Sequence, residues 1–391
     1  AQVILVRDAC FCHSHILGKA MKRCLSVCAL FVLLPAVWLY PYAEQIQTSL
    51  KAMYILATMP NEDITNFFQA YEVLEKMGTD GKFGVKSEAE AKAMHDYYKV
   101  LNQICAAGVV LEIMALPPTI DQTKTIQENQ YLWMDRVIKY LNVKPGERVL
   151  DTGSGRGKPA SYLLEKTGAG VIQVNIDETQ LEFGKEWAKA KGIDDRMEFH
   201  LQDFNLPFSY IKDESLGGQY CFQACAFISN KTKHLKEMYR VVKPGGYVVQ
   251  LEWLTKDFGE KPDNSPTGRY GNFVFENATH HELVRKMGVL FGGAFPSGVL
   301  EWEAAFKEAG FELVLSHDPG EVPSFKMFDD ANKIYEPLAD AIIWLGDKGI
   351  LPKRLGDLFI RLRTYYDAAA VAYQTDLASL TWEFVARKPL K

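Results

Sequence analysis

The stretch ERVLDTGSGRGKPASYLLEK (residues 147–166) constrains the fold of this 391-residue chain more than any other. A short β-rich segment ends at Asp151, three glycines follow at Gly153, Gly155 and Gly157, and a helix pattern begins directly after them. Glycines at alternate positions let the backbone turn tightly and bring its N–H groups against a ligand. The N-terminus of the following helix favours a carboxylate or phosphate. The segment therefore predicts a strand, a ligand-binding turn and a helix.

Strand and helix patterns alternate after this turn. Four further strands are predicted at 171–175, 197–203, 219–227 and 247–253, with helices at 178–192 and 234–246. This alternation predicts an α/β, Rossmann-like parallel sheet with helices on both faces. Polar residues end the predicted strands, namely Asp151, Asn175, Asp203, Gln223 and Glu252. Because ligands in such sheets bind beyond the carboxyl ends of the strands, we expect these side chains to surround one site.

The spacing of the glycines narrows the choice of ligand. A dinucleotide site requires G-x-G-x-x-G, with an acid about 20 residues later for the ribose. This chain has D-x-G-x-G-x-G from Asp151 to Gly157. This glycine pattern favours S-adenosylmethionine as the cofactor.

The N-terminal region contains an uncharged stretch, CLSVCALFVLLPAVWLYPYA (24–43), which is long enough to cross a bilayer as a helix. Bases precede it, and aromatic residues that favour the membrane interface crowd its far end. We predict a tail at 1–23 and a membrane helix at 24–43. A targeting segment is the alternative. Cys10, Cys12, His13 and His15 form C-x-C-H-x-H, but without a second ligand cluster we predict no metal site.

The remaining boundaries divide the chain into three parts. Residues 44–130 are predicted to be a helical connecting region, in which Ser87 caps a helix whose His95 and Tyr97 serve packing. Residues 131–255 form the Rossmann-like core. Residues 256–391 hold two last strands, at 311–317 and 380–389, around a helix-rich insertion. Seven cysteines without regular spacing suggest reduced thiols.

Charge excludes one class of partner. The formal net charge is -5 and the pI is about 6.0, so no concentrated basic face for nucleic acid is expected. A small-molecule or lipid substrate fits better.

Four segments, LDTGSGRGKPA, VNIDETQL, YRVVKPGGYVVQLEWLTKD and FVARKP, resemble the sterol side-chain (24-C) methyltransferases, which have the class I S-adenosylmethionine-dependent methyltransferase fold. The resemblance covers about residues 131–391. It implies that Asn175 and Gln180 lie near the ribose and that Asp203 and Phe204 lie near the adenine. The insertion between the last two strands would form a helical lid over the acceptor. The predicted cofactor-binding residues are Asp151, Gly153, Gly155, Gly157, Asn175, Gln180, Gln202, Asp203, Phe204 and Gln223.

The chain also departs from this family. The aromatic, glycine-rich substrate motif of the family, Y-E-x-G-W-G, has no counterpart. The family's acid and histidine after the fourth strand are replaced by Gln223 and Phe227. Glu252 then becomes the candidate catalytic carboxylate, because methylation of an alkene leaves a carbocation that must lose a proton.

Three functions remain open at this point. The first is a membrane-associated methyltransferase for a sterol or similar lipid, in the endoplasmic reticulum by family resemblance or in an organellar membrane. The second is a methyltransferase for another small acceptor, such as a quinone or phenol. The third is a catalytically inactive, methyltransferase-like subunit of a larger membrane assembly.

Overall fold

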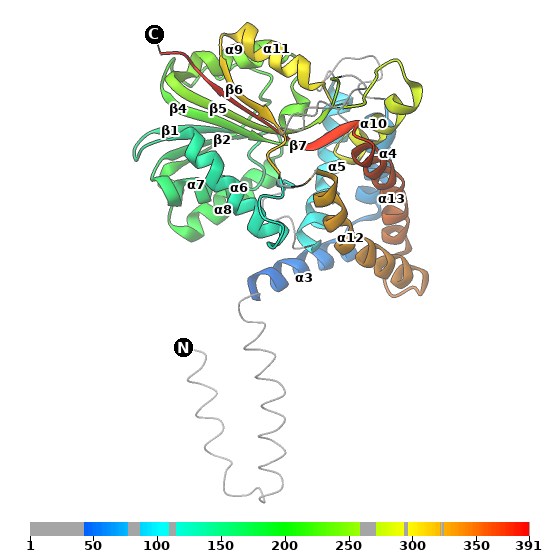
Figure 1. Ribbon diagram of the computed structural model, residues 1–391. Helices are drawn as coiled ribbons and strands as arrows, with labels where there is room; N and C mark the ends of the chain where they lie inside the picture. Colours follow the sequence, from blue (N-terminus) through cyan, green and yellow to red (C-terminus); the bar gives the residue numbers. More distant parts are fainter. Residues whose placement is uncertain are drawn as a thin grey trace, which may run out of the picture. The chain divides into compact units, whose positions relative to one another are not determined.

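The core of the fold is a seven-stranded mixed sheet. The computed structural model describes residues 43–76, 87–108, 115–258, 271–292, 296–320, 322 and 324–390. The strands are β1 (Arg148–Thr152), β2 (Gly170–Asn175), β3 (Met197–Leu201), β4 (Leu216–Phe222), β5 (Val242–Thr255), β6 (Glu312–His317) and β7 (Ala378–Arg387). Their spatial order is β3-β2-β1-β4-β5-β7-β6. The first five strands are parallel, and β7 is antiparallel to both β5 and β6 (Figure 1).

Helices cover both faces of this sheet. One face packs against α6 (Ile126–Leu141), α7 (Lys158–Thr167) and α8 (Glu178–Lys191), and the other against α9 (Lys231–Val241) and α11 (Val299–Ala309). Successive residues of a strand therefore belong to the hydrophobic cores on opposite faces of the sheet. Val149 packs on the face covered by α6, and Leu150 packs on the face covered by α9. The predicted Rossmann-like sheet with helices on both faces is confirmed, with β7 as its antiparallel addition.

Two predicted boundaries were wrong. The fourth strand ends at Phe222 rather than at residue 227, because Gln223 has φ +53° and Cys225–Phe227 form a 3-10 turn. The helix predicted at 234–246 is α9, which ends at Val241. Pro244 excludes a helical conformation for the residue before it, so β5 begins at Val242.

The helices before and after the core pack together at one end of the sheet. The earlier helices are α4 (Asn61–Leu74) and α5 (Glu88–Gly108), and the later ones are α10 (Ala278–Leu290), α12 (Ser324–Asp347) and α13 (Lys353–Gln374). The ring of Tyr71 on α4 stacks on that of Tyr365 on α13, with centroids 5.1 Å apart. The predicted helical insertion before the last strand is thus present as α12 and α13 (Figure 1).

The predicted N-terminal features lie almost wholly outside the described residues. These are the tail at 1–23, its C-x-C-H-x-H motif and the membrane helix at 24–43, of which only Ala43 is described, as the first residue of α3 (Ala43–Thr58). Among the helices that the structure does describe, none combines the length and the apolar character of a membrane span.

The segment FVARKP, which carried part of the family resemblance, has a structural role. Lys388 is nearly fully buried, and its ammonium donates to the carbonyl oxygens of Tyr239 (2.6 Å) and Val242 (2.9 Å) and to Glu214 Oε1 (3.2 Å). It therefore ties β7 to the junction of α9 and β5.

Replacing Lys388 with methionine is expected to lower the free energy of unfolding by about 2–4 kcal/mol, because two carbonyls and a carboxylate lose a charged donor. Urea denaturation of the full chain measures this. Lys189→Met, at an exposed position on α8, is the matched control and should change the free energy by less than about 0.5 kcal/mol. Equal effects of the two substitutions would contradict the assignment.

Candidate functional site

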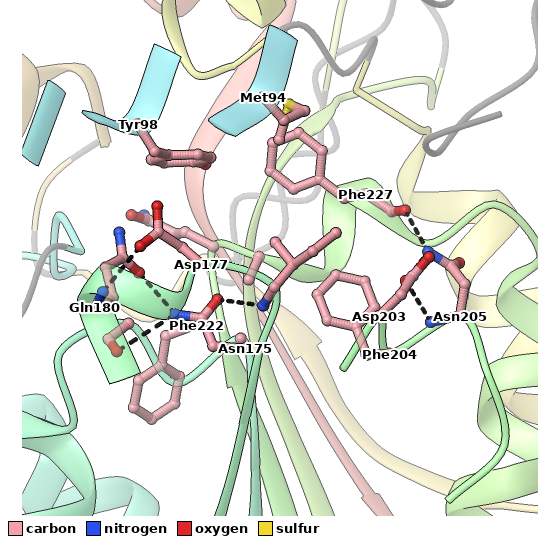
Figure 2. A pocket seen from close by; sticks show the side chains of 15 residues that line it. Met94, Tyr98, Asn175, Asp177, Gln180, Asp203, Phe204, Asn205, Phe222 and Phe227 are labelled. Atoms are coloured by element: carbon pink, nitrogen blue, oxygen red, sulfur yellow. Dashed lines mark hydrogen bonds between the residues drawn. The ribbon is translucent and has the colours of Figure 1, made fainter. Parts of the chain in front are cut away.

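A pocket opens at the carboxyl ends of β1, β2 and β4 and is covered by α5 (Figure 2). This is the position that the predicted sheet assigned to a ligand. The residues that line it are Met94, Tyr98, Gly153, Gly155, Asn175, Ile176, Asp177, Gln180, Asp203, Phe204, Asn205, Phe222, Gln223, Ala224 and Phe227.

The glycine turn forms one wall of the pocket. Gly153, Gly155 and Gly157 all have positive φ values, at +74°, +55° and +75°. A Cβ on Gly153 would lie 2.4 Å from Ala224 Cβ, so this glycine allows the turn to approach the segment after β4. A Cβ on Gly155 would meet nothing closer than Gln180 Oε1 at 3.9 Å, which leaves open space beside the backbone. Gly157 lies outside the pocket lining and begins α7.

The two basic residues of the turn point away from the pocket. Arg156 donates to the carbonyl oxygen of Asn102 (2.7 Å), and its guanidinium lies 5.0 Å from the centre of the Phe183 ring. The ammonium of Lys158 lies 3.1 Å from the centre of the Trp187 ring, where the aromatic face attracts a cation. Neither residue lines the hollow, so neither blocks a ligand.

Polar side chains at the end of β2 face the pocket. Asn175 Nδ2 donates to Gln180 Oε1 (2.7 Å), and Asp177 Oδ1 accepts from the backbone N–H of Gln180 (2.8 Å), which caps α8. The pair predicted to lie near the ribose, Asn175 and Gln180, is therefore brought together. Asp177 adds a carboxylate that the sequence interpretation did not select.

The residues after β3 add a second polar group to the lining. Asp203, Phe204 and Asn205 line the pocket, and Asp203 Oδ1 accepts from the backbone N–H and the side chain of Asn205, both at 2.8 Å. Gln202 does not line it, because its amide donates to the carbonyl oxygen of Pro207 (3.2 Å). The structure thus places Asp203 and Phe204, but not Gln202, where a ligand can reach them.

Gln223 lines the pocket, and its side-chain amide is hydrogen-bonded to the protein backbone. Its amide oxygen accepts from Leu116 N (2.9 Å), and its amide nitrogen donates to the carbonyl oxygens of Leu116 (2.9 Å) and Leu380 (2.8 Å). The side-chain amide of Gln223 thus joins the segment before α6 and strand β7 to the end of β4, and its contact with the cofactor stays a prediction.

Asp151 also has a different place from the predicted one. It is buried beneath the glycine turn, and its Oδ2 accepts from the hydroxyl of Tyr220 (2.8 Å). Burial raises the pKa of this carboxyl to about 7, against the lowering effect of the Tyr220 hydrogen bond. Asp151 does not line the pocket, so it supports the turn from below rather than contacting a ligand.

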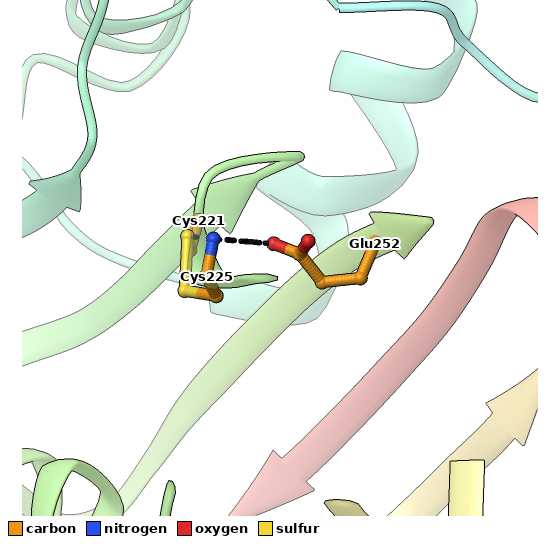
Figure 3. Close-up of side chains that lie close together, drawn as sticks. All are labelled: Cys221, Cys225 and Glu252. Carbon is orange, nitrogen blue, oxygen red and sulfur yellow. Dashed lines mark hydrogen bonds between the residues drawn. A yellow bond between two sulfur atoms is a disulfide. The ribbon is translucent and has the colours of Figure 1, made fainter. Parts of the chain in front are cut away.

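Glu252 is not exposed to the pocket either. It is fully buried, and it accepts a hydrogen bond from the backbone N–H of Cys225 (2.7 Å; Figure 3) and another from that of Ala226 (3.1 Å). Burial raises its pKa to about 8, although these N–H groups favour the charged form. The prediction that Glu252 faces an acceptor as a base was wrong, because its carboxyl holds the turn that follows β4.

The same turn carries a disulfide between Cys221 and Cys225, whose Cα atoms are 6.3 Å apart (Figure 3). The expectation of reduced thiols was therefore wrong for this pair. The left-handed conformation of Gln223 reverses the chain and brings residues four apart within bonding reach. Glu252 Oε1 lies 3.8 Å from the sulfur of Cys221, so the disulfide and the carboxyl stabilise one segment of the pocket wall.

Sequence analysis missed several lining residues, namely Met94, Tyr98, Asp177, Asn205 and Phe227. Met94 and Tyr98 are four apart, so they share one face of α5 (Figure 2). The packing role predicted for Tyr97 agrees with its burial, and His95 is exposed. A signal for Asp177 was present, since it lies inside the segment VNIDETQL that carried the resemblance.

Comparisons with known proteins agree with this geometry. Residues 150–250 match the family model of a methyltransferase domain. The sterol methyltransferase-like 1 of Botryococcus braunii is 26% identical over 271 residues, which cover 67% of this chain and 64% of that protein. The sterol 24-C-methyltransferase of Aspergillus fumigatus is 31% identical over 202 residues, 51% of this chain and 47% of that protein. The chain therefore spans less than two thirds of the length of these relatives.

A solved structure shows the same fold. The crystal structure of the cyclase SpnF superposes with a TM-score of 0.56 at 18% identity and covers 79% of this chain and 100% of its own. The methyltransferase-domain match bears out the predicted cofactor, S-adenosylmethionine. The predicted resemblance is confirmed: this chain contains a methyltransferase domain and is similar to the sterol 24-C-methyltransferases.

Proposed function

We propose that this protein is an S-adenosylmethionine-dependent C-methyltransferase whose acceptor is a sterol or a similar isoprenoid lipid. The observation that carries the proposal is the two-sided pocket beside the glycine turn. One side presents the carboxylates of Asp177 and Asp203, and the other presents the rings of Tyr98 and Phe227. A polar cofactor and an apolar acceptor would meet where these sides join.

The cofactor side suits a nucleoside with an amino-acid tail. Asp177 and Asp203 can accept hydrogen bonds from hydroxyl and amino groups, and the ring of Phe204 offers a flat apolar face. The open space beside Gly155 allows a ligand to approach the backbone. These residues would hold S-adenosylmethionine, which supplies an activated methyl group when bound.

The acceptor side is aromatic. Phe227 contacts Trp253 with ring centroids 6.3 Å apart, and Trp253 lies 5.3 Å from Phe291. Gly292 brings the chain close to Phe227 and Tyr98, since a Cβ there would lie 3.2 Å from the first ring and 3.4 Å from the hydroxyl of the second. Such rings exclude water and stabilise a developing cation by about 0.5–2 kcal/mol each. This environment favours an alkene acceptor.

The chain contributes mainly orientation. A bound S-adenosylmethionine would supply the methyl group on a sulfonium that becomes a neutral thioether, so the residues of the pocket would have to align acceptor and cofactor rather than supply an acid. Glu252 and the disulfide fix the turn that carries Phe227, and Gln223 fixes its position relative to β7. Glu252, the disulfide and Gln223 therefore affect the reaction by holding the pocket wall in place.

A second candidate acceptor follows from the same turn. The amide of Gln223 is fully engaged and Phe227 is apolar, so this part of the described wall offers no acid or base to an acceptor. An acceptor that is itself a good nucleophile, such as a phenol or quinol, depends less on an acid or base from the protein, so it is the second candidate.

We further propose that residues 24–43 hold the protein at a membrane, of the endoplasmic reticulum or of an organelle. The support is the uncharged 20-residue sequence itself, with bases before it and aromatic residues at its far end. A lipid acceptor would then be taken from the bilayer.

Asp203→Ala is expected to weaken binding of S-adenosylmethionine about 10- to 100-fold, since hydrogen bonds to a charged group contribute about 1.5–3 kcal/mol. Titration calorimetry with the full chain measures it. Asp195→Ala is the matched control, because this exposed acid lies on the η2 turn (Asp194–Arg196), outside the pocket.

Mass spectrometry of products then identifies the acceptor. Incubation with cofactor and either sterols or phenols should give a methylated sterol and an unchanged phenol. A methylated phenol alone would select the second candidate. If the unsubstituted protein gave no heat with S-adenosylmethionine, the enzymatic function would be excluded and the inactive-subunit function would remain.

A further inference from the structure

Helix α5, which precedes the methyltransferase domain, contributes two residues to the pocket lining and a third that contacts a lining residue. Met94 and Tyr98 line it, and Asn102 is the next residue on the same face, one turn further along. Asn102 is 2% exposed, which is unusual for an amide on a helix whose other buried positions are mainly apolar. A buried side-chain amide is normally hydrogen-bonded to other polar groups.

Asn102 contacts both walls of the cofactor side. Its Oδ1 accepts from Gln180 Nε2 (2.8 Å). Its backbone carbonyl accepts from Arg156 in the glycine turn (2.7 Å). One residue of the helical region is therefore bound to the β2–α8 turn and to the glycine turn at once.

The direction of these hydrogen bonds is set by the backbone. The N–H of Ile176 can only donate, so it fixes Asn175 Oδ1 as its acceptor (2.9 Å). Asn175 Nδ2 must then donate to Gln180 Oε1 (2.7 Å), and Gln180 Nε2 must donate to Asn102 Oδ1. We call Asn175, Gln180 and Asn102 the amide relay. If any one of these amides were rotated by 180°, a donor would face a donor or an acceptor would face an acceptor, so all three orientations are fixed together.

The amide relay ends in a donor. Asn102 Nδ2 is buried and has no hydrogen-bond partner among the described residues. A buried donor without an acceptor is unfavourable. Asn102 does not line the pocket itself, so the amide relay reaches a bound ligand through Gln180, which does.

We propose that Asn102 is a positioning residue for the cofactor, which acts through Gln180. It fixes the orientation of the Gln180 amide and thereby joins α5 to the cofactor side of the pocket. The inference rests on the proposed function, because it assigns a role in binding S-adenosylmethionine.

Three variants of the full chain test the proposal by calorimetry with S-adenosylmethionine. Asn102→Leu removes both the acceptor and the donor and should weaken binding about 10- to 100-fold. Asn102→Asp keeps an acceptor for Gln180 and should recover most of the lost affinity. Gln103→Ala, the half-buried neighbour on α5, is the control and should bind like the unsubstituted chain.

A double-variant cycle separates positioning from general packing. If Asn102 acts through Gln180, the Asn102→Leu substitution should weaken binding much less when Gln180 is already alanine. If the losses multiply independently in the double variant, Asn102 does not act through Gln180 and the proposal is overturned. Hydrogen exchange of residues 178–191 without ligand should also rise in Asn102→Leu and stay unchanged in Gln103→Ala.

The outcomes distinguish this inference from the proposed function. Binding by the unsubstituted chain with no loss in Asn102→Leu overturns only the role of Asn102. Absence of binding by the unsubstituted chain overturns both. An Asn102→Asp variant that binds as weakly as Asn102→Leu would also contradict positioning, because the acceptor for Gln180 is retained there.

Discussion

Gly153→Ala is expected to destabilise the protein by about 2–5 kcal/mol and to abolish measurable binding of S-adenosylmethionine. A left-handed residue with a Cβ costs about 1–2 kcal/mol, and the forced contact adds about 1–3 kcal/mol. Here φ is +74° and the new Cβ would lie 2.4 Å from Ala224 Cβ, which has no flexible side chain to move aside. Urea denaturation gives the free energy of unfolding, and calorimetry gives the affinity.

Two other glycines make this experiment specific. Gly192→Ala has the same backbone penalty, at φ +67°, with nothing within 4 Å of the new Cβ, so it should lose only about 1–2 kcal/mol and bind normally. Gly155→Ala, at φ +55°, should match it in stability but bind at least about 10-fold more weakly, because the added methyl group occupies ligand space. Normal cofactor affinity in Gly155→Ala would mean that the ligand lies elsewhere.

Glu252→Gln is expected to remove a large part of the pH dependence of stability. The pKa of Glu252 is raised from 4.5 to about 8 in the folded protein. Between these pH values the folded state holds a proton that the unfolded state has released, so stability falls as pH rises. The slope is at most about 1.4 kcal/mol per pH unit. Glutamine does not titrate, so the stability of the variant relative to the unsubstituted chain should rise by about 4 kcal/mol from pH 4.5 to 8.

Urea denaturation at pH 5, 6, 7 and 8 measures this difference. Glu178→Gln, at an exposed position in the first turn of α8, should keep the slope of the unsubstituted chain. The raised pKa of Asp151 also makes the folded protein less stable as pH rises from 3.8 to about 7. The Asp151→Asn substitution should therefore reduce the slope of stability against pH in that range. A difference between Glu252→Gln and the unsubstituted chain that does not change with pH would show that Glu252 is ionised throughout.

The parts of the fold that sequence analysis predicted are those set by local chemistry. The turn at Gly153 to Gly157 needs positive φ at alternate residues, which only glycine adopts without strain, so the turn is visible in the sequence itself. The strand before it and the helix after it have their own hydrophobic periodicities. Asn175, Asp203 and Phe204 line the pocket where the sequence predicts a ligand, because ligands in a parallel sheet bind beyond the carboxyl ends of the strands.

The errors concern residues whose roles depend on distant contacts. Glu252 lies near the end of the buried strand β5, but its carboxyl accepts from backbone N–H groups of a turn 26 and 27 residues earlier. Gln223 continues an apolar pattern, and its left-handed conformation arises from contacts with Leu116 and Leu380. The contribution of α5 could not be predicted, because Asn102 meets Gln180 across 78 residues of sequence.

The order of the strands has a consequence for synthesis. Strand β7 lies between β5 and β6, yet it follows both in the chain. When a ribosome has produced β6, α12 and α13, β6 still lacks its neighbour, and one edge of β5 offers unpaired N–H and C=O groups to any other extended chain. The nascent protein therefore carries this open edge of β5 until residues 378–387 emerge, and another extended chain can pair with it during that interval.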